Sequence, residues 1–159
     1  QTRIDQLIAL DASYFPGNIS KARIRGVEGQ LGGNLAGWQL QGYLGWLQPR
    51  NEDGGANDGK LLPRRRARTA RVDLDRRFGA FGLGATVNAA GPGYDDAANR
   101  HRLGGYATTD LRASWHFAPD WQLEARLANV LDHRYETVRY FNQPGRAAFL
   151  TLRYSPAAR

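Results

Sequence analysis

Thr109-Asp-Leu-Arg-Ala-Ser-Trp-His-Phe117 alternates in polarity, because charged or hydroxyl side chains separate Leu111, Ala113 and Trp115. The next segment, Trp121-Gln-Leu-Glu-Ala-Arg-Leu127, repeats the arrangement. Successive side chains of a β-strand point to opposite faces, so a period of two separates an apolar face from a charged one. Both segments are therefore predicted to be strands that have one apolar face and one charged face.

The same alternation recurs along most of the chain and predicts an all-β fold. Helical spacing of apolar residues is poorly matched almost everywhere. We expect the strands to form an antiparallel meander, in which each strand pairs with its neighbours in chain order. The eight expected strands cover residues 3–12, 20–32, 37–48, 64–76, 79–90, 103–117, 121–131 and 146–154.

The expected connections alternate between short and long. Outer-membrane barrels have tight periplasmic turns and long extracellular loops, and this rhythm predicts the wall of a transmembrane β-barrel. The apolar face is then expected to contact lipid, and Arg112, Glu124, Arg126 and Arg153 of the charged face are expected to point into the lumen. Short turns are expected at Gly33–Ala36, Arg76–Gly79 and Ala118–Asp120, and long polar loops at 13–19, 49–63, 91–102 and 132–145.

Aromatic residues agree with this orientation. Barrels carry aromatic girdles where the strands meet the two membrane interfaces. Trp46 marks one girdle, since it lies eight residues, or about 26 Å along a strand, from Trp38. The aromatic residues of the other girdle, beside the short turns, are Trp38, Trp115, Phe117, Trp121 and Tyr154.

Composition and charge narrow the function classes. The chain has no Cys or Met, and its 159 residues have a mean hydropathy of −0.58, so apolar residues are scattered. No stretch approaches the roughly 18 apolar residues of a membrane-spanning helix. The net charge is +7, and positively charged residues are most concentrated in an arginine cluster, which we interpret as a solvated or lipopolysaccharide-facing loop base. No nucleic-acid partner is expected, because no recognition helix or aromatic stacking platform accompanies the cluster. Its members are Arg64, Arg65, Arg66, Arg68 and Arg71.

Catalytic and metal-binding patterns are not apparent. His101, His116 and His133 lack ligand-type spacing. Asp95 and Asp96 are adjacent on a glycine-rich loop, where carboxylates most often form turns. We therefore expect no enzyme activity, no metal site and no cofactor.

Three segments near the end of the chain resemble the last strands of TonB-dependent receptors. They begin at Tyr106-Ala-Thr-Thr-Asp, at Trp121-Gln-Leu-Glu-Ala and at Pro144-Gly-Arg-Ala-Ala. The resemblance is carried by Asn129-Val-Leu-Asp132 with Tyr135, and by the Pro-Gly-Arg that opens a final strand ending in an aromatic residue. Upstream, Ala22-Arg-Ile-Arg-Gly-Val-Glu looks like the Gly-Val-Glu strand of that family.

Within the family, the loops look most like those of cobalamin receptors. The matching pieces are Leu61-Leu-Pro-Arg-Arg-Arg-Ala, Gly93-Tyr-Asp-Asp, Leu103-Gly-Gly-Tyr and Tyr135-Glu-Thr. Such receptors are 22-stranded barrels with an N-terminal plug, so the resemblance implies a partial barrel, with its last eight strands in residues 1–154. The short tail in 155–159 departs from the family, whose barrels commonly end at or just after a terminal aromatic residue, here Tyr154. The resemblance also implies an outer-membrane location, contact with lipid and lipopolysaccharide, a cobalamin-type ligand, and coupling to TonB through a plug that has no counterpart in these residues.

The resemblance also implies two ligand contacts. Arg65 lies where the family's Leu-x-Arg-Arg-Ala stretch carries an arginine facing the corrinoid, and a guanidinium suits amide and phosphate acceptors. Ala98 is the second expected contact, in the loop from Tyr94 to Arg102.

Two alternatives remain open from the sequence. Siderophore and other nutrient receptors share the strand motifs, so the ligand rests on a few loop residues. A complete eight-stranded structural or adhesion barrel would need a packed charged interior. Gly82, Gly84, Thr86 and Asn88 predict instead that one wall is small and open.

Overall fold

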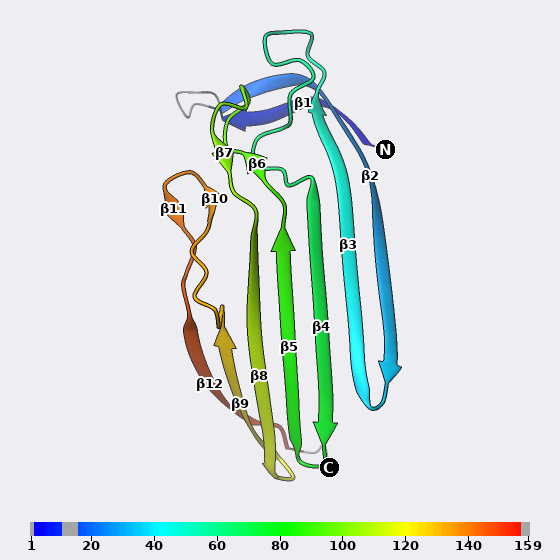
Figure 1. Cartoon of the computed structure of the whole chain (residues 1–159), viewed down its shortest axis with the longest axis vertical. Coiled ribbons are helices and arrows are strands. Elements are labelled where there is room, and N and C mark those ends of the chain that lie inside the picture. The colour runs from blue at the N-terminus through cyan, green and yellow to red at the C-terminus, as the bar shows by residue number, and fades with distance from the viewer. Residues whose placement is uncertain (1, 11–15, 157–159) are drawn as a thin grey trace.

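One antiparallel sheet dominates the computed structural model, which describes residues 2–10 and 16–156. Eight strands follow chain order in this sheet, which confirms the expected meander (Figure 1). No helix in the described part of the chain is long and apolar enough to cross a membrane. The strands are β1 (Thr2–Leu10), β2 (Pro16–Leu35), β3 (Trp38–Asn51), β4 (Arg68–Phe78), β5 (Phe81–Ala90), β8 (Tyr106–Ala118), β9 (Trp121–Ala128) and β12 (Ala147–Tyr154).

Two short hairpins lie in regions that the sequence analysis treated as loops. β6 (Gly93–Tyr94) pairs with β7 (Arg102–Leu103), and β10 (Glu136–Val138) pairs with β11 (Phe141–Asn142). Strands of two or three residues are too short to carry a detectable period. Both hairpins lie at the end of the sheet that holds the long loops, and the short turns lie at the other end (Figure 1).

Several expected boundaries are wrong. β2 begins at residue 16 and pairs with β1, so residues 16–19 are strand and not loop; residues 11–12 of the first expected strand and 13–15 of that loop lie outside the described residues. β4 begins only at Arg68, because Pro63 removes a donor and Arg64 takes a left-handed conformation at φ 57°. The first short turn is Ala36–Gly37, where both φ angles are positive, and not Gly33–Ala36.

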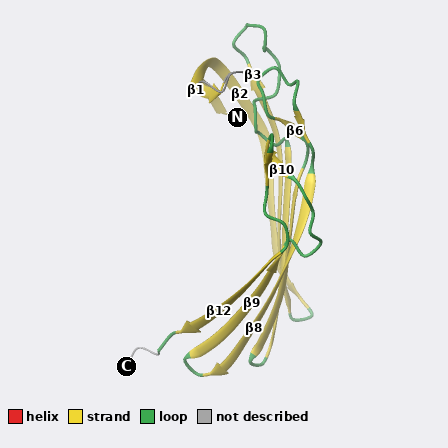
Figure 2. Ribbon diagram, turned by 90° about the vertical axis from the view of Figure 1, so that its left-hand side faces the viewer, coloured by secondary structure: helices red, strands yellow, loops and turns green. Residues whose placement is uncertain are grey.

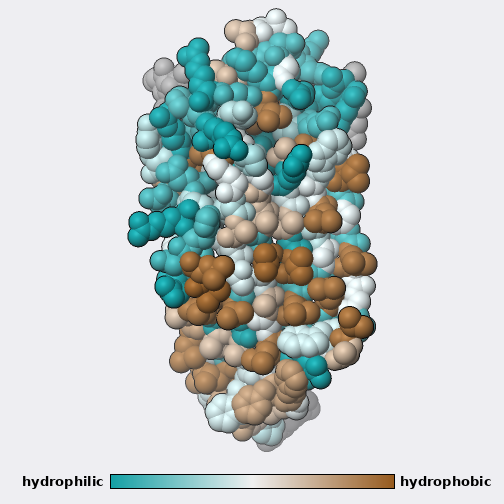
Figure 3. Space-filling view, in the orientation of Figure 1, coloured by the Kyte–Doolittle hydropathy of each residue, from teal (hydrophilic) through white to brown (hydrophobic). Residues whose placement is uncertain are grey.

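The two faces of the sheet differ as the alternation predicts. The register places Leu83, Ala113 and Ala125 in one row of the outer face. Leu111, Trp115, Leu150 and Leu152 are exposed there. Figure 3 shows the apolar residues of one face as a band over the half nearer the short turns, with hydrophilic residues toward the loop end.

The opposite face is concave and polar. The sheet is strongly curved (Figure 2). A cavity of about 970 Å³ is lined by residues of β2, β3, β4, β5, β8, β9 and β12, which a curved sheet can gather only on its concave face. Arg112, Glu124 and Arg126 line this cavity, as predicted for the lumen.

Aromatic side chains form a continuous belt at the short-turn end of the outer face. Phe81 stacks on Trp115 at 5.8 Å between ring centroids, and Trp121 contacts Tyr154 at 4.7 Å. Phe117 bridges Trp115 and Trp121. The girdle expected beside the short turns is therefore confirmed.

The lipid-facing assignment of the apolar face can be tested at Leu111, which pairs with Ala85 and Leu127 between the two aromatic levels. Leu111→Arg should cost about 2–4 kcal/mol of unfolding free energy in lipid vesicles, because the guanidinium would enter hydrocarbon. Denaturant titration of the refolded protein measures the loss. The same change at the exposed loop residue Leu131 is the control, and an equal effect at both positions would contradict the assignment.

Candidate functional site

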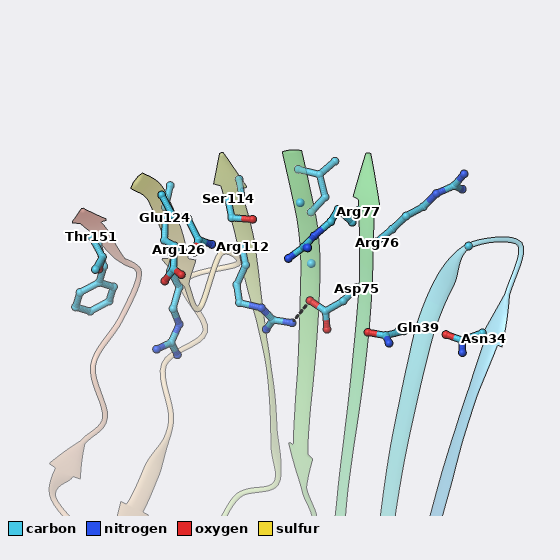
Figure 4. A pocket seen from close by; sticks show the side chains of 18 residues that line it. Asn34, Gln39, Asp75, Arg76, Arg77, Arg112, Ser114, Glu124, Arg126 and Thr151 are labelled. Carbon is cyan, nitrogen blue, oxygen red and sulfur yellow. Dashed lines mark hydrogen bonds and ion pairs between the residues drawn. The ribbon is translucent and has the colours of Figure 1, made fainter. Parts of the chain in front are cut away.

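Charged side chains on the concave face pair across a row of small residues. Asp75, Gly84 and Arg112 are direct neighbours in the register of β4, β5 and β8. The Asp75 carboxylate and the Arg112 guanidinium meet at 2.8 Å over Gly84 (Figure 4). A Cβ at Gly84 would lie 2.1 Å from the Asp75 oxygen, so only glycine leaves room for this ion pair.

The neighbouring row extends the network. Arg71 donates to Asp73 at 2.6 and 2.8 Å, and the Thr86 hydroxyl donates to Asp73 at 2.6 Å. Arg112 also donates to Thr86. The small residues of β5 therefore do not leave the wall open, as the sequence suggested, because longer side chains from β4 and β8 reach across them.

Farther along the face, the remaining predicted lumen charges also pair. Arg126 contacts Asp110 at 2.5 Å, and Arg153 contacts Glu124 at 3.4 Å. Asp110 also accepts the Asn129 N–H at 2.9 Å. Each of the four predicted lumen charges thus has a charged partner on the same wall.

At the loop end, Arg64 and Arg66 join the three segments between the long strands. Arg64 forms an ion pair with Asp95 at 2.8 Å, and Asp95 is only 8% exposed. The backbone N–H of Arg64 also donates to the Tyr94 carbonyl at 2.7 Å. Asp95 in turn accepts the Arg139 N–H at 3.3 Å, which brings in the loop that carries β10 and β11.

Arg66 holds the same loops through their backbone. Its guanidinium donates to the carbonyls of Gly91 at 3.0 Å, Gly104 at 2.9 Å and Glu136 at 3.0 Å. It also lies over the Tyr106 ring, 5.7 Å from the centroid, and that ring stacks on Tyr135. The five donors of a guanidinium allow one residue to bind carbonyls from separate loops.

Arg65 differs from both of its neighbours. Its side chain is exposed. In the described part of the chain, no hydrogen bond or ion pair engages its guanidinium. The structure thus presents one uncommitted cation between two arginines that are fully engaged.

Ala98 lies in a turn of the joined loops. The adjacent residue, Asn99, has a positive φ of 55°. Its side-chain amide donates to the Leu61 carbonyl and accepts the Leu61 N–H, both at 2.9 Å. These two hydrogen bonds fasten the turn to the segment that leads into Arg65. Both expected contact residues therefore lie in one loop assembly, which consists of the loops that Arg64 and Arg66 join.

Asp96 organises the other side of that turn. Its carboxylate accepts the N–H groups of His101 at 2.7 Å and Arg100 at 3.1 Å. Burial opposes ionisation, but these backbone hydrogen bonds and the nearby His101 ring hold the pKa of Asp96 below its ordinary value. The interpretation of Asp96 as a turn former is confirmed, whereas its neighbour Asp95 is an ion-pair partner.

The Asn129–Asp132 turn fixes the last loop to the sheet. The Asn129 side chain accepts the His133 N–H at 3.0 Å and donates to the His133 carbonyl at 2.9 Å. Asp132 accepts the Arg146 N–H at 2.8 Å, and a Cβ at Gly145 would lie 2.6 Å from that carboxylate. The motif that resembled the family is therefore a structural tie between β9 and β12.

The sequence analysis missed Arg66, Asp95 and Asn99 as organisers of this site. Their partners in the other loops lie 25 to 70 residues away in the sequence. No local spacing could have identified them, although the run of three arginines indicated that this segment mattered.

The role of Arg66 as a tie between loops can be measured by amide hydrogen exchange. Arg66→Gln should raise exchange rates in residues 91–105 and 132–139 together, because carbonyls in both segments lose a donor. Arg102→Gln removes the same charge from an exposed position of β7 and is the control. Faster exchange confined to the neighbours of residue 66 would contradict the role.

Comparisons with known proteins agree with the fold. Residues 1–130 match the family model described as TonB dependent receptor-like, beta-barrel. The vitamin B12 transporter of Photobacterium profundum is 30% identical over 162 aligned positions, which cover 97% of this chain and 26% of the transporter.

Solved structures show the same arrangement of strands. The siderophore receptor PiuA of Acinetobacter baumannii superposes with a TM-score of 0.80 at 19% identity, over 96% of this chain and 24% of that one. The ferric yersiniabactin uptake receptor FyuA of Yersinia pestis gives a TM-score of 0.70 at 26% identity, over 86% and 23%.

This chain spans about a quarter of the length of these relatives. The matched family consists of receptors and transporters of the outer membrane, which places the short turns on the periplasmic side and the loop assembly outside the cell. The chain belongs to the TonB-dependent receptor family and contributes strands and loops of its outer-membrane β-barrel.

Proposed function

We propose that this chain forms wall and extracellular loops of a receptor that imports cobalamin. The observation that carries the proposal is Arg65, an exposed guanidinium that its neighbours leave uncommitted in a loop assembly held by Arg64 and Arg66. Similarity to a vitamin B12 transporter along 97% of the chain supports this choice of ligand. The role is binding and transport, with no catalytic step.

A fixed cation suits the acceptors of a corrinoid. Cobalamin presents amide and phosphate oxygens, and a guanidinium binds such groups with directed hydrogen bonds. The ties around Arg65 reduce the conformational freedom that its loop would lose on binding. Ala98 offers a small side chain on the neighbouring turn, which leaves room for a bulky ligand.

The edges of the sheet support a longer barrel and not a small closed one. β1 and β12 are the two edge strands of the described sheet. Unpaired backbone groups are costly in hydrocarbon, so both edges need further strands in a membrane. The family's plug, which couples to TonB, would then occupy the lumen against the concave face.

A siderophore is the second candidate ligand. The structural neighbours include the siderophore receptor PiuA and the ferric yersiniabactin uptake receptor FyuA, and FyuA is 26% identical to this chain. The exposed Arg65 guanidinium would also attract an anionic ferric chelate. The ligand therefore has to be decided by binding measurements.

Cobalamin binding to Arg65→Ala and Arg68→Ala separates a specific contact from a general charge effect. Both changes remove one positive charge, but the register places Arg68 beside Trp46 on the outer face. Arg65→Ala should weaken binding by about 1–3 kcal/mol more, because a ligand acceptor loses its partner in a partly desolvated site. Equal losses of affinity that become smaller with added salt would instead indicate a general electrostatic attraction, which salt screens.

The measurement uses the whole purified receptor that contains this chain, and titration calorimetry gives both affinities. A ferric siderophore is titrated in parallel. Binding of the siderophore without binding of cobalamin would replace the ligand proposed here and leave the barrel assignment unchanged.

A further inference from the structure

The concave face is divided into a charged part and an uncharged part, and the boundary runs between β3 and β4. Every lumen-facing position in the lower part of β4 carries a charge, and these residues are Arg71, Asp73, Asp75 and Arg77. Three of these rows continue onto β3 and β2, where no lumen-facing side chain is charged. We call the uncharged set the amide lane, which consists of Gln30, Gly32, Asn34, Gln39, Gln41 and Tyr43.

Asn34 and Gln39 show that the amide lane faces the lumen. Both line the cavity of the concave face, and they lie beside each other on neighbouring strands (Figure 4). Side chains of a strand alternate between its faces, so Gln30, Gly32 and Gln41 share that face. The lane leads from the side of the loops toward the short turn at Ala36–Gly37.

The two parts of the wall differ in whether their side chains are occupied. Arg71 and Asp73 bind each other at 2.6 Å, and Asp75 is paired with Arg112 at 2.8 Å. The four amide side chains of the lane are exposed, and within the described residues no hydrogen bond or ion pair engages them. A Cβ at Gly32 would meet only a backbone carbonyl, at 3.9 Å. The lane therefore combines free hydrogen-bonding groups with open space.

Uncharged amides suit a surface along which a ligand moves. A side-chain amide carries both donors and acceptors, so it can bind a ligand amide in either orientation. Its hydrogen bonds are about half as strong as those of charged groups, and they replace bonds to water at a small net gain. Passage needs several successive sites that bind strongly enough for entry and weakly enough for release. Rows of the lane repeat about every 7 Å along the strands, which is within the reach of one large ligand.

We propose that the amide lane is the path along which an uncharged, amide-rich ligand crosses the lumen. The inference rests on the proposed function, because the amide groups of cobalamin are the partners that the lane would bind. The neighbouring charges of β4 and β8 neutralise one another and leave few groups free for such a ligand. The path deepens the proposed role, since it concerns passage and not the external contact at Arg65.

The test measures two quantities on the whole receptor that contains this chain. They are the affinity of the purified receptor for cobalamin and the maximal rate at which cells that express it take up labelled cobalamin. Gln39→Leu and Gln41→Leu remove the amide and keep a side chain of similar size. Each should lower the maximal rate about fivefold, equivalent to roughly 1 kcal/mol, and leave the affinity within about twofold of the wild type. Gln41→Asn keeps an amide and should restore most of the rate.

Thr151→Val is the matched control. Thr151 is exposed and uncharged and lines the same cavity, but it is the register partner of Glu124 in the charged part. Loss of its hydroxyl should leave both the rate and the affinity within about twofold of the wild type. Thermal unfolding of each purified variant shows that it is folded, and its amount in the outer membrane corrects the rate.

An unchanged rate in both leucine variants, or an equal loss in Thr151→Val, would overturn the path. A loss of affinity at an unchanged maximal rate would place these amides at the external binding site and would also overturn it. Lower thermal stability without slower uptake would mean that the amides hold the folded plug instead. Failure of the wild type to bind cobalamin would overturn the proposed function, whereas binding with unaltered uptake in the variants would overturn the path alone.

Discussion

The backbone hydrogen-bond ladder between neighbouring strands is the constraint on which the other features of this structure depend. A wall inside a membrane has no water to satisfy its N–H and C=O groups, so every strand must pair with the next. Pairing fixes the register, and the register decides which side chains share a row. The ion pair between Asp75 and Arg112, the aromatic belt and the arginine beside Trp46 all follow from residues that the ladder brings level.

The two faces of the sheet use charge in opposite ways. On the concave face, acids and arginines from neighbouring strands neutralise one another, and Gly84 and Thr86 are small enough to let them meet. Desolvated charges are tolerated only when they are paired and hydrogen-bonded. On the outer face, the exposed Arg68 lies level with Trp46, at the height where the aromatic residues of barrels meet the membrane interface.

The loop assembly shows how one residue type takes three roles within three positions. Arg64 is held by a buried carboxylate, Arg66 by backbone carbonyls from separate loops, and Arg65 is left to solvent. The two engaged residues give the third a defined position. The segment that carries the exposed Arg65 is thereby held on both sides, which suits recognition of a polar ligand.

The sequence by itself determined the all-β class, the eight long strands, their pairing in chain order, the two faces and the end that carries the loops. A period of two and the spacing of turn residues are local signals, and a strand that must bury one face in lipid expresses them strongly. The family motif around Asn129 was equally legible, because its hydrogen bonds to His133 are local.

Only the tertiary structure decided which of the three adjacent arginines is free and how Asp95 and Asn99 join the loops. These features arise from contacts between residues far apart in the chain and from two hairpins too short to show a period. The sequence also did not reveal that β4 begins at Arg68. We expected the strand to begin at residue 64, but Pro63 and the left-handed conformation of Arg64 prevent strand pairing there. Side-chain partners depend on the register and the curvature of the whole sheet, and neither is encoded in any single segment.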